Sequence, residues 1–132
     1  MNDTEAYRAA VRLLAASDKT AAQLCNRLTE KGFSEEDAAD AAARLESEGY
    51  LNEYRYAEKT VERLYNAFYG KEYVREYLKE KEFSDPALEY AEEYMSALNF
   101  NASAEAYIKK LISSGKSKEQ AKAALYRRGF TN

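Results

Sequence analysis

The feature that most constrains the fold of this chain is an internal repeat. The stretch Leu24–Phe33 aligns with Val74–Phe83 at an offset of 50 residues, and Ala121–Phe130 follows at a further offset of 47. The same offsets superpose apolar residues of the preceding segments: Val11 on Val61 and Ile108, and Leu14 on Leu64 and Leu111. Self-similarity at one period predicts tandem copies of a supersecondary unit that stack to bury a continuous core.

Each copy has helical periodicity, and no segment shows sustained period-two alternation, so we expect an all-α fold. Three residue pairs have the spacing of a helix capping box or a close relative of it: Thr20 with Gln23, Ser117 with Gln120, and Ser34 with Asp37. All five glycines are isolated and indicate helix stops: Gly32, Gly49, Gly70, Gly115 and Gly129. The predicted helices are 4–16, 20–31, 35–48, 53–68, 71–82, 85–97, 102–113 and 118–128.

These helices group into repeated three-helix units. We predict a first unit over 1–52, a second over 53–100 and a partial third, of two helices, over 101–132. A unit of this size has a marginal core of its own, so neighbouring units must stack. The predicted architecture is a set of tandem three-helix repeats that form an elongated, curved helical array. A plain helical bundle with accidental self-similarity is the alternative.

The composition argues against an enzyme. The chain has no His and a single Cys, so it lacks the usual nitrogen and sulfur metal ligands and the commonest general base. Because its glycines are isolated, it also lacks a phosphate-binding loop. We therefore expect no catalytic residue, no metal and no cofactor. No run of 18 apolar residues exists and the first residues are polar, so we expect a cytoplasmic protein without membrane association.

Charge is distributed unevenly along the chain. Residues 1–52 carry 6 Lys and Arg against 10 Asp and Glu, residues 53–100 carry 7 against 11, and residues 101–132 carry 7 against 2. The balances are therefore −4, −4 and +5. A basic end on an acidic body favours polyanions or an acidic protein surface as partners. The acidic remainder argues against wrapping nucleic acid over the whole length. The positive charge of residues 101–132 opposes self-association through this end and favours docking on an acidic neighbour, so we expect a monomer.

One segment links the chain to a known family. The stretch Gly49–Ala57, with the sequence GYLNEYRYA, resembles the Gly-Tyr-Leu-(Asn/Asp)-(Asp/Glu)-x-x-(Phe/Tyr)-Ala stretch of the RecX family. Tyr69-Gly70 before a short helix and the apolar spacing of Val74 and Leu78 match as well. The three-helix repeats are also similar to that family, so the resemblance covers nearly the whole chain.

The resemblance implies a function. RecX proteins bind RecA and modulate, usually inhibit, its filament on DNA, and they are not enzymes. For this chain it implies a bacterial regulator of recombination and of the DNA-damage (SOS) response, with the RecA filament on DNA as partner. Weak direct contact with DNA stays open, and the acidic first two units argue against it. Many family members have Gly where this chain has Glu82, and they complete the third unit.

Candidate partner-binding residues lie in two segments. Within 71–82, helical spacing places Lys71, Arg75 and Lys79 on one stripe and Tyr73 and Tyr77 on another. Arg and Tyr often anchor interfaces. The alternative is a self-neutralised solvent face, because acidic residues are spaced to pair with these cations. The third unit adds further basic candidates: Lys109, Lys110, Lys118, Lys122, Arg127 and Arg128.

Two other functions are compatible with the sequence. In the first, the pair of helices 102–113 and 118–128 acts like a helix-turn-helix, and the protein is a small nucleic-acid-binding module. In the second, the chain is a generic helical scaffold of the armadillo or HEAT type, which no specific residue pattern favours.

Overall fold

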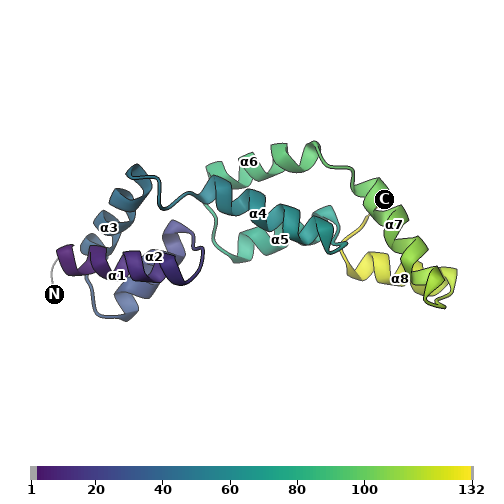
Figure 1. Ribbon diagram of the computed structural model, residues 1–132, viewed down its shortest axis with the longest axis horizontal. Helices are drawn as coiled ribbons and strands as arrows, with labels where there is room; N and C mark the ends of the chain where they lie inside the picture. Colours follow the sequence, from purple (N-terminus) through teal and green to yellow (C-terminus); the bar gives the residue numbers. More distant parts are fainter. Residues whose placement is uncertain (1–2, 132) are drawn as a thin grey trace.

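A computed structural model describes residues 3–131, which fold into eight α-helices and contain no β-strand. The helices are α1 (Asp3–Ala16), α2 (Ala21–Glu30), α3 (Glu35–Ser47), α4 (Glu53–Asn66), α5 (Lys71–Glu80), α6 (Asp85–Ser96), α7 (Phe100–Ser113) and α8 (Lys118–Arg127). They form an elongated molecule with α1, α2 and α3 at one end and α7 and α8 at the other (Figure 1). None of them is long and apolar enough to cross a lipid bilayer. The predicted all-α array is confirmed.

Each helix of the structure begins and ends within two residues of its predicted bounds. The Thr20–Gln23 and Ser117–Gln120 pairs form complete capping boxes. The predicted helices 53–68 and 71–82 end two residues early, because Phe68 and Glu82 have φ angles of 65° and 63°. A residue in the left-handed region ends a helix whatever its type. Glycine favours this conformation and can be recognised in a sequence as a helix end, whereas Phe and Glu do not favour it.

The helices pack in local groups. A first buried core joins α1, α2 and α3 and contains Leu24, Leu28 and Leu45, and a second joins α4, α5 and α6 around Val61 and Leu78. Helix α7 packs on α8. The residue boundaries 1–52, 53–100 and 101–132 stay a prediction.

The first helix departs from the predicted repeat register. Val61 is fully buried, but Val11, its predicted counterpart, is 42% exposed, and Ala10 is buried in its place. The reason lies after α1, where no left-handed residue corresponds to Phe68. There the buried Lys19 ammonium donates to the carbonyl oxygen of Leu13 at 2.9 Å and caps the helix end. The sequence alignment of α1 with α4 is therefore wrong by one residue.

The second helix of each group meets the next one end to end. The hydroxyl of Thr20, at the start of α2, donates to the carbonyl oxygen of Lys81, at the end of α5, over 3.2 Å. In the same way the Gly70 amide, at the start of α5, donates to the carbonyl oxygen of Arg128, at the end of α8, over 2.6 Å. The prediction of Gly70 as a helix stop is wrong, because it is the N-cap of α5. Its lack of a side chain allows this close approach, because a Cβ atom there would lie 2.4 Å from the Gly129 backbone.

A buried carboxylate joins the first two helix groups. Glu53, the first residue of α4, is 9% exposed. Its Oε2 accepts from the Ala21 amide at 2.9 Å, and its Oε1 accepts from the Ser84 amide at 2.8 Å. These amides lie at the starts of α2 and α6, where the helix dipole favours negative charge. One side chain therefore satisfies backbone donors of two helices and fixes them against a third.

Two Tyr–Glu hydrogen bonds link α4 to α6. Tyr90 donates to Glu58, and Tyr94 donates to Glu62 one turn further along both helices. The bond to Glu62 is the main cause that raises the pKa of Tyr94 to about 12.

We expect this pKa to appear as a loss of stability in alkali. The folded pKa of Tyr94 lies above its ordinary value of 10.0, so folding favours the neutral phenol. Its contribution is complete below pH 10 and is lost as the pH rises toward 12. Absorbance titration should find one tyrosine that ionises later than the others, and Tyr94→Phe should abolish that late step. A late step of unchanged amplitude in Tyr94→Phe would assign it to another tyrosine.

Candidate partner-binding surface

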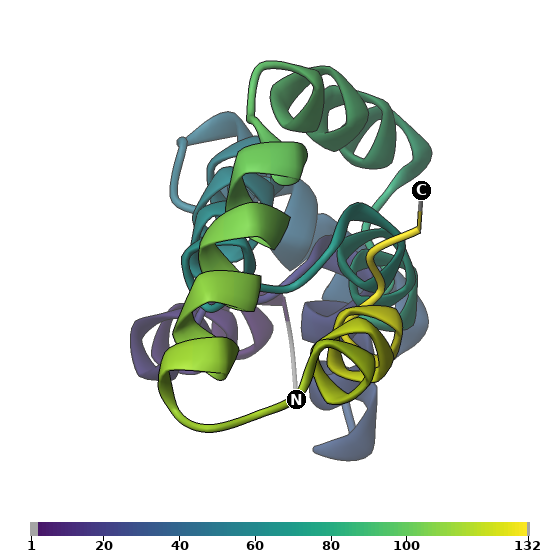
Figure 2. The same cartoon turned by 90° about the vertical axis from the view of Figure 1, so that its right-hand side faces the viewer.

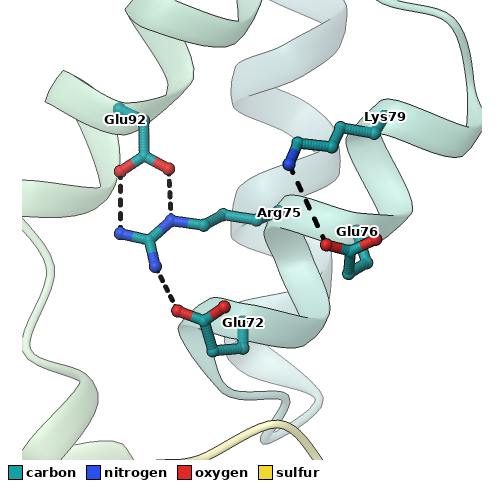
Figure 3. Close-up of polar contacts among 5 residues, drawn as sticks. All are labelled: Glu72, Arg75, Glu76, Lys79 and Glu92. Atoms are coloured by element: carbon teal, nitrogen blue, oxygen red, sulfur yellow. Dashed lines mark hydrogen bonds and ion pairs between the residues drawn. The ribbon is translucent and has the colours of Figure 1, made fainter.

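The predicted basic stripe lies on α5 and is partly neutralised within the chain. The Arg75 guanidinium forms a bidentate pair with the Glu92 carboxylate of α6, with 3.0 Å between Nη2 and Oε2 and a second bond from Nε (Figure 3). It also donates to Glu72, one turn earlier on α5. The central cation of the stripe is thus held by two carboxylates of the same molecule.

This pairing changes the acidity of both groups. The hydrogen bond from Arg75 is the main cause that lowers the pKa of Glu92, and the same bond raises the pKa of the Arg75 guanidinium. The side chains are 33% and 43% exposed, so water screens much of the attraction. The main consequence is geometric, because the pair orients Arg75 toward α6.

The other two cations of the stripe differ from each other. Lys79 Nζ lies 3.9 Å from Glu76 Oε1, with both side chains well exposed (Figure 3). Lys71 forms no ion pair with any residue that the structure describes. A self-neutralised solvent face therefore describes Arg75 and Lys79, whereas Lys71 is half-buried and contributes only a weaker attraction that lowers the pKa of Glu92. The role of this stripe in partner binding stays a prediction.

The second predicted stripe of α5 belongs to a stack of aromatic rings. The rings of Tyr69 and Tyr73 lie 4.2 Å apart between centroids, and those of Tyr73 and Tyr77 lie 6.3 Å apart. Their interplanar angles of 21° and 27° make these stacked contacts. The spacing of four residues along the chain places the three rings one above the other. Tyr73 is therefore enclosed between two other tyrosines.

Cations lie over both ends of this stack. The Arg128 guanidinium is 4.4 Å from the centroid of Tyr69. At the other end, Arg63 and Lys81 lie 5.4 and 5.3 Å from the centroid of Tyr77. Arg63 also donates to the Tyr77 hydroxyl at 3.0 Å. Such contacts between a cation and a ring face are favourable and hold each charged group in place.

The stack continues from Arg128 onto α7. The Arg128 guanidinium is also 5.1 Å from the ring of Tyr107, which stacks on Phe68 at 5.3 Å. Lys110 lies 5.3 Å over Phe68. Arg128 is anchored by a hydrogen bond to the carbonyl oxygen of Ala67 over 2.7 Å. Together these residues form what we call the cation–ring strip: Arg63, Phe68, Tyr69, Tyr73, Tyr77, Lys81, Tyr107, Lys110 and Arg128.

The structure places the predicted site residues in different surroundings. Tyr73, Tyr77, Lys110 and Arg128 join the strip. The remaining basic candidates of α7 and α8 are exposed and form no ion pair within residues 3–131: Lys109, Lys118, Lys122 and Arg127. Figure 2 looks onto this end of the molecule, with α7 and α8 in front.

Sequence reasoning missed five members of the strip: Arg63, Phe68, Tyr69, Lys81 and Tyr107. Tyr69 had a signal, because it precedes Tyr73 by four residues. The others come from three different helices or the turns after them, and only tertiary packing brings them together.

Comparisons with known proteins place the chain in a family. The sequence model described as the first three-helix domain of RecX matches residues 6–45. The chain is 47% identical over 58 residues to the regulatory protein RecX of Trichlorobacter lovleyi, which covers 44% of this chain and 38% of that protein. It is 33% identical over 78 residues to that of Legionella pneumophila, over 59% of this chain and 52% of that protein. The matched segments thus span about half or less of these two relatives.

A longer match comes from Vibrio vulnificus, whose regulatory protein RecX is 30% identical over 126 residues, 92% of this chain and 82% of that protein. The fold is also similar to a crystal structure of RecX from Lactobacillus salivarius, with a TM-score of 0.81 at 20% identity over 98% of this chain and 88% of that one. A second RecX crystal structure has a TM-score of 0.76 at 17% identity, over 98% and 67%. The repeat, the helical array and the extended match to the Vibrio protein agree, and the chain belongs to the RecX family.

Proposed function

We propose that this protein is a non-enzymatic regulator that binds the RecA filament on DNA and inhibits its recombination and DNA-damage-response activity. The observation that carries the proposal is the match to a regulatory protein RecX along 92% of the chain. An elongated helical array also suits a filament, because it offers a long surface of stacked units. The predicted contacts lie on the second unit, 53–100, and the partial third unit, 101–132, which carry all the candidate binding residues.

The test compares two partners. The protein should co-sediment with RecA assembled on single-stranded DNA, and it should slow DNA strand exchange by that filament. The same DNA without RecA is the control. Binding to bare DNA as tight as binding to the filament, with no effect on strand exchange, would contradict the proposal.

The stripe on α5 supplies a prediction about the docking residues. We expect Lys71→Glu combined with Lys79→Glu to weaken filament binding about tenfold, because charge reversal costs on the order of 1.4 kcal/mol at an interface with acidic groups. This pair leaves both partners of the Arg75–Glu92 contact in place. Folding should change by less than about 0.5 kcal/mol, as is usual for surface positions without specific contacts, since Lys79 is exposed and Lys71 is half-buried without an ion pair among residues 3–131.

The matched control is Arg12→Glu with Lys31→Glu, which reverses two exposed charges of the first helix group. Its filament affinity should stay near that of the unaltered protein. Equal losses for both pairs would mean that only the overall charge matters, and no loss for the α5 pair would remove the stripe from the docking surface.

A further inference from the structure

The cations of the basic stripe on α5 and those of the cation–ring strip differ in how their charge is neutralised. Arg75 and Lys79 face carboxylates of their own chain. The four cations of the cation–ring strip form no ion pair with any carboxylate among residues 3–131: Arg63, Lys81, Lys110 and Arg128. They are held instead by aromatic rings, which orient a cation without cancelling its charge. The strip therefore keeps its positive charge in a fixed arrangement.

The strip is a continuous line of contacts with cations at both ends. From Lys110 through Phe68, Tyr107 and Arg128 to Tyr69, each contact joins neighbours 4.4 to 5.3 Å apart. It crosses from the third helix group to the second and ends at Arg63 and Lys81, near the contact with α2. A succession of fixed cations along such a line matches a linear polyanion better than a compact acidic side chain.

The rings of the strip are not free to stack on bases. Tyr73 has a tyrosine on either side, Tyr69 has Arg128 over it, and Tyr107 is buried between Phe68 and Arg128. Proteins that read single strands by stacking keep ring faces open for successive bases. Here the rings hold the cations, and the cations are the groups left to meet a ligand.

We propose that the cation–ring strip binds the sugar–phosphate backbone of a single-stranded nucleic acid, without base stacking and without sequence preference. One line of contacts with cations at both ends fits one strand, whereas duplex DNA presents two phosphate rows across a groove about 12 Å wide. The +5 balance of residues 101–132 draws a polyanion to the end where the strip begins. This inference does not depend on RecA, and the test contains none, so its failure is distinct from failure of the proposed function.

The test measures fluorescence anisotropy with two labelled probes, oligo(dT) and an abasic deoxyribose-phosphate oligomer of the same length. We expect the two affinities to agree within about threefold, because the bases take no part. The variant Arg63→Gln, Lys81→Gln, Lys110→Gln should bind both probes at least tenfold more weakly. Its slope of log affinity against log salt should fall by about 2, since each phosphate contact to a single strand contributes about 0.7.

A matched control removes three exposed charges of the first helix group: Arg8→Gln, Arg12→Gln and Lys31→Gln. Its affinity should fall less than threefold. Should the triple strip variant lose its helical circular dichroism, Lys81→Gln with Lys110→Gln breaks no side-chain hydrogen bond and should still weaken binding three- to fivefold.

Four results would overturn the proposal. They are no measurable binding of either probe, equal losses in strip and control variants, abasic binding more than tenfold weaker than oligo(dT) binding, and tighter binding of duplex than of single-stranded DNA. Normal oligo(dT) binding by the strip variant would assign the strip another role, and the proposal would also fail.

Discussion

Gly70→Ala is expected to destabilise the protein by about 3 kcal/mol and to release α8 from α5, because the new methyl group has no room. A Cβ atom at Gly70 would lie 2.4 Å from the Gly129 carbonyl group and from the Phe130 amide nitrogen. All three neighbours are backbone atoms, so no side chain can rotate away. The Gly70–Arg128 hydrogen bond and the cap that Arg128 places on Ala67 should be lost together.

The Gly70→Ala substitution tests the steric clash of the added Cβ atom alone. Gly70 has a φ of −85°, which alanine adopts readily, so backbone strain adds nothing. The matched control is Gly115→Ala, where φ is +99° and no atom lies within 4 Å of the added Cβ. That control should cost only about 1 kcal/mol, the ordinary penalty of a left-handed alanine.

Thermal unfolding and amide hydrogen exchange together measure the result. In Gly70→Ala, the amides of α8 should lose protection while those of α2 keep theirs, because the contact broken lies at one joint. Equal stability losses in Gly70→Ala and Gly115→Ala would show that the close approach of α5 and α8 is not tight in solution.

Much of the fold could be predicted because its signals are local. Capping boxes at Thr20 and Ser117 and glycine stops at Gly32 and Gly49 involve residues within one turn of each other, and the structure forms them as expected. The helix ends at Phe68 and Glu82 could not be predicted, since neither residue type favours a positive φ. The one-residue shift of α1 had no signal either, because neither the different turn after α1 nor the burial of Lys19 is marked in the sequence.

The candidate surfaces were less predictable, for a related reason. Helical spacing placed Lys71, Arg75 and Lys79 on one stripe and indicated that Glu72 could pair with Arg75. It could not show that Glu92, on another helix, takes the same guanidinium. Sequence spacing identifies neighbours along one helix only. A charge without a partner on its own helix can therefore still be neutralised by a residue of another helix.

The joint between α2 and α4 carries the second large effect that we expect. Glu53→Ala should lower the free energy of unfolding by about 3 kcal/mol, because hydrogen bonds to a charged group contribute about 1.5 to 3 kcal/mol each. The substitution leaves the amides of Ala21 and Ser84 without their acceptor at a site where Glu53 itself is 9% exposed. Glu53→Gln has a side chain of similar shape that retains one acceptor oxygen. It should lower the free energy of unfolding by about half as much.

Glu46→Ala is the matched control. Glu46 and Glu53 line one open cavity of about 480 Å³, but Glu46 is exposed and accepts neither amide. Its effect on chemical denaturation should stay within about 0.5 kcal/mol. Because Glu53 links the starts of α2, α4 and α6, its loss should also let the first two helix groups move relative to each other, which small-angle X-ray scattering would record as a changed radius of gyration. An unchanged radius and an unchanged unfolding midpoint in Glu53→Ala would mean that water replaces the carboxylate at both amides, and that the joint is held by the Thr20–Lys81 contact and by packing instead.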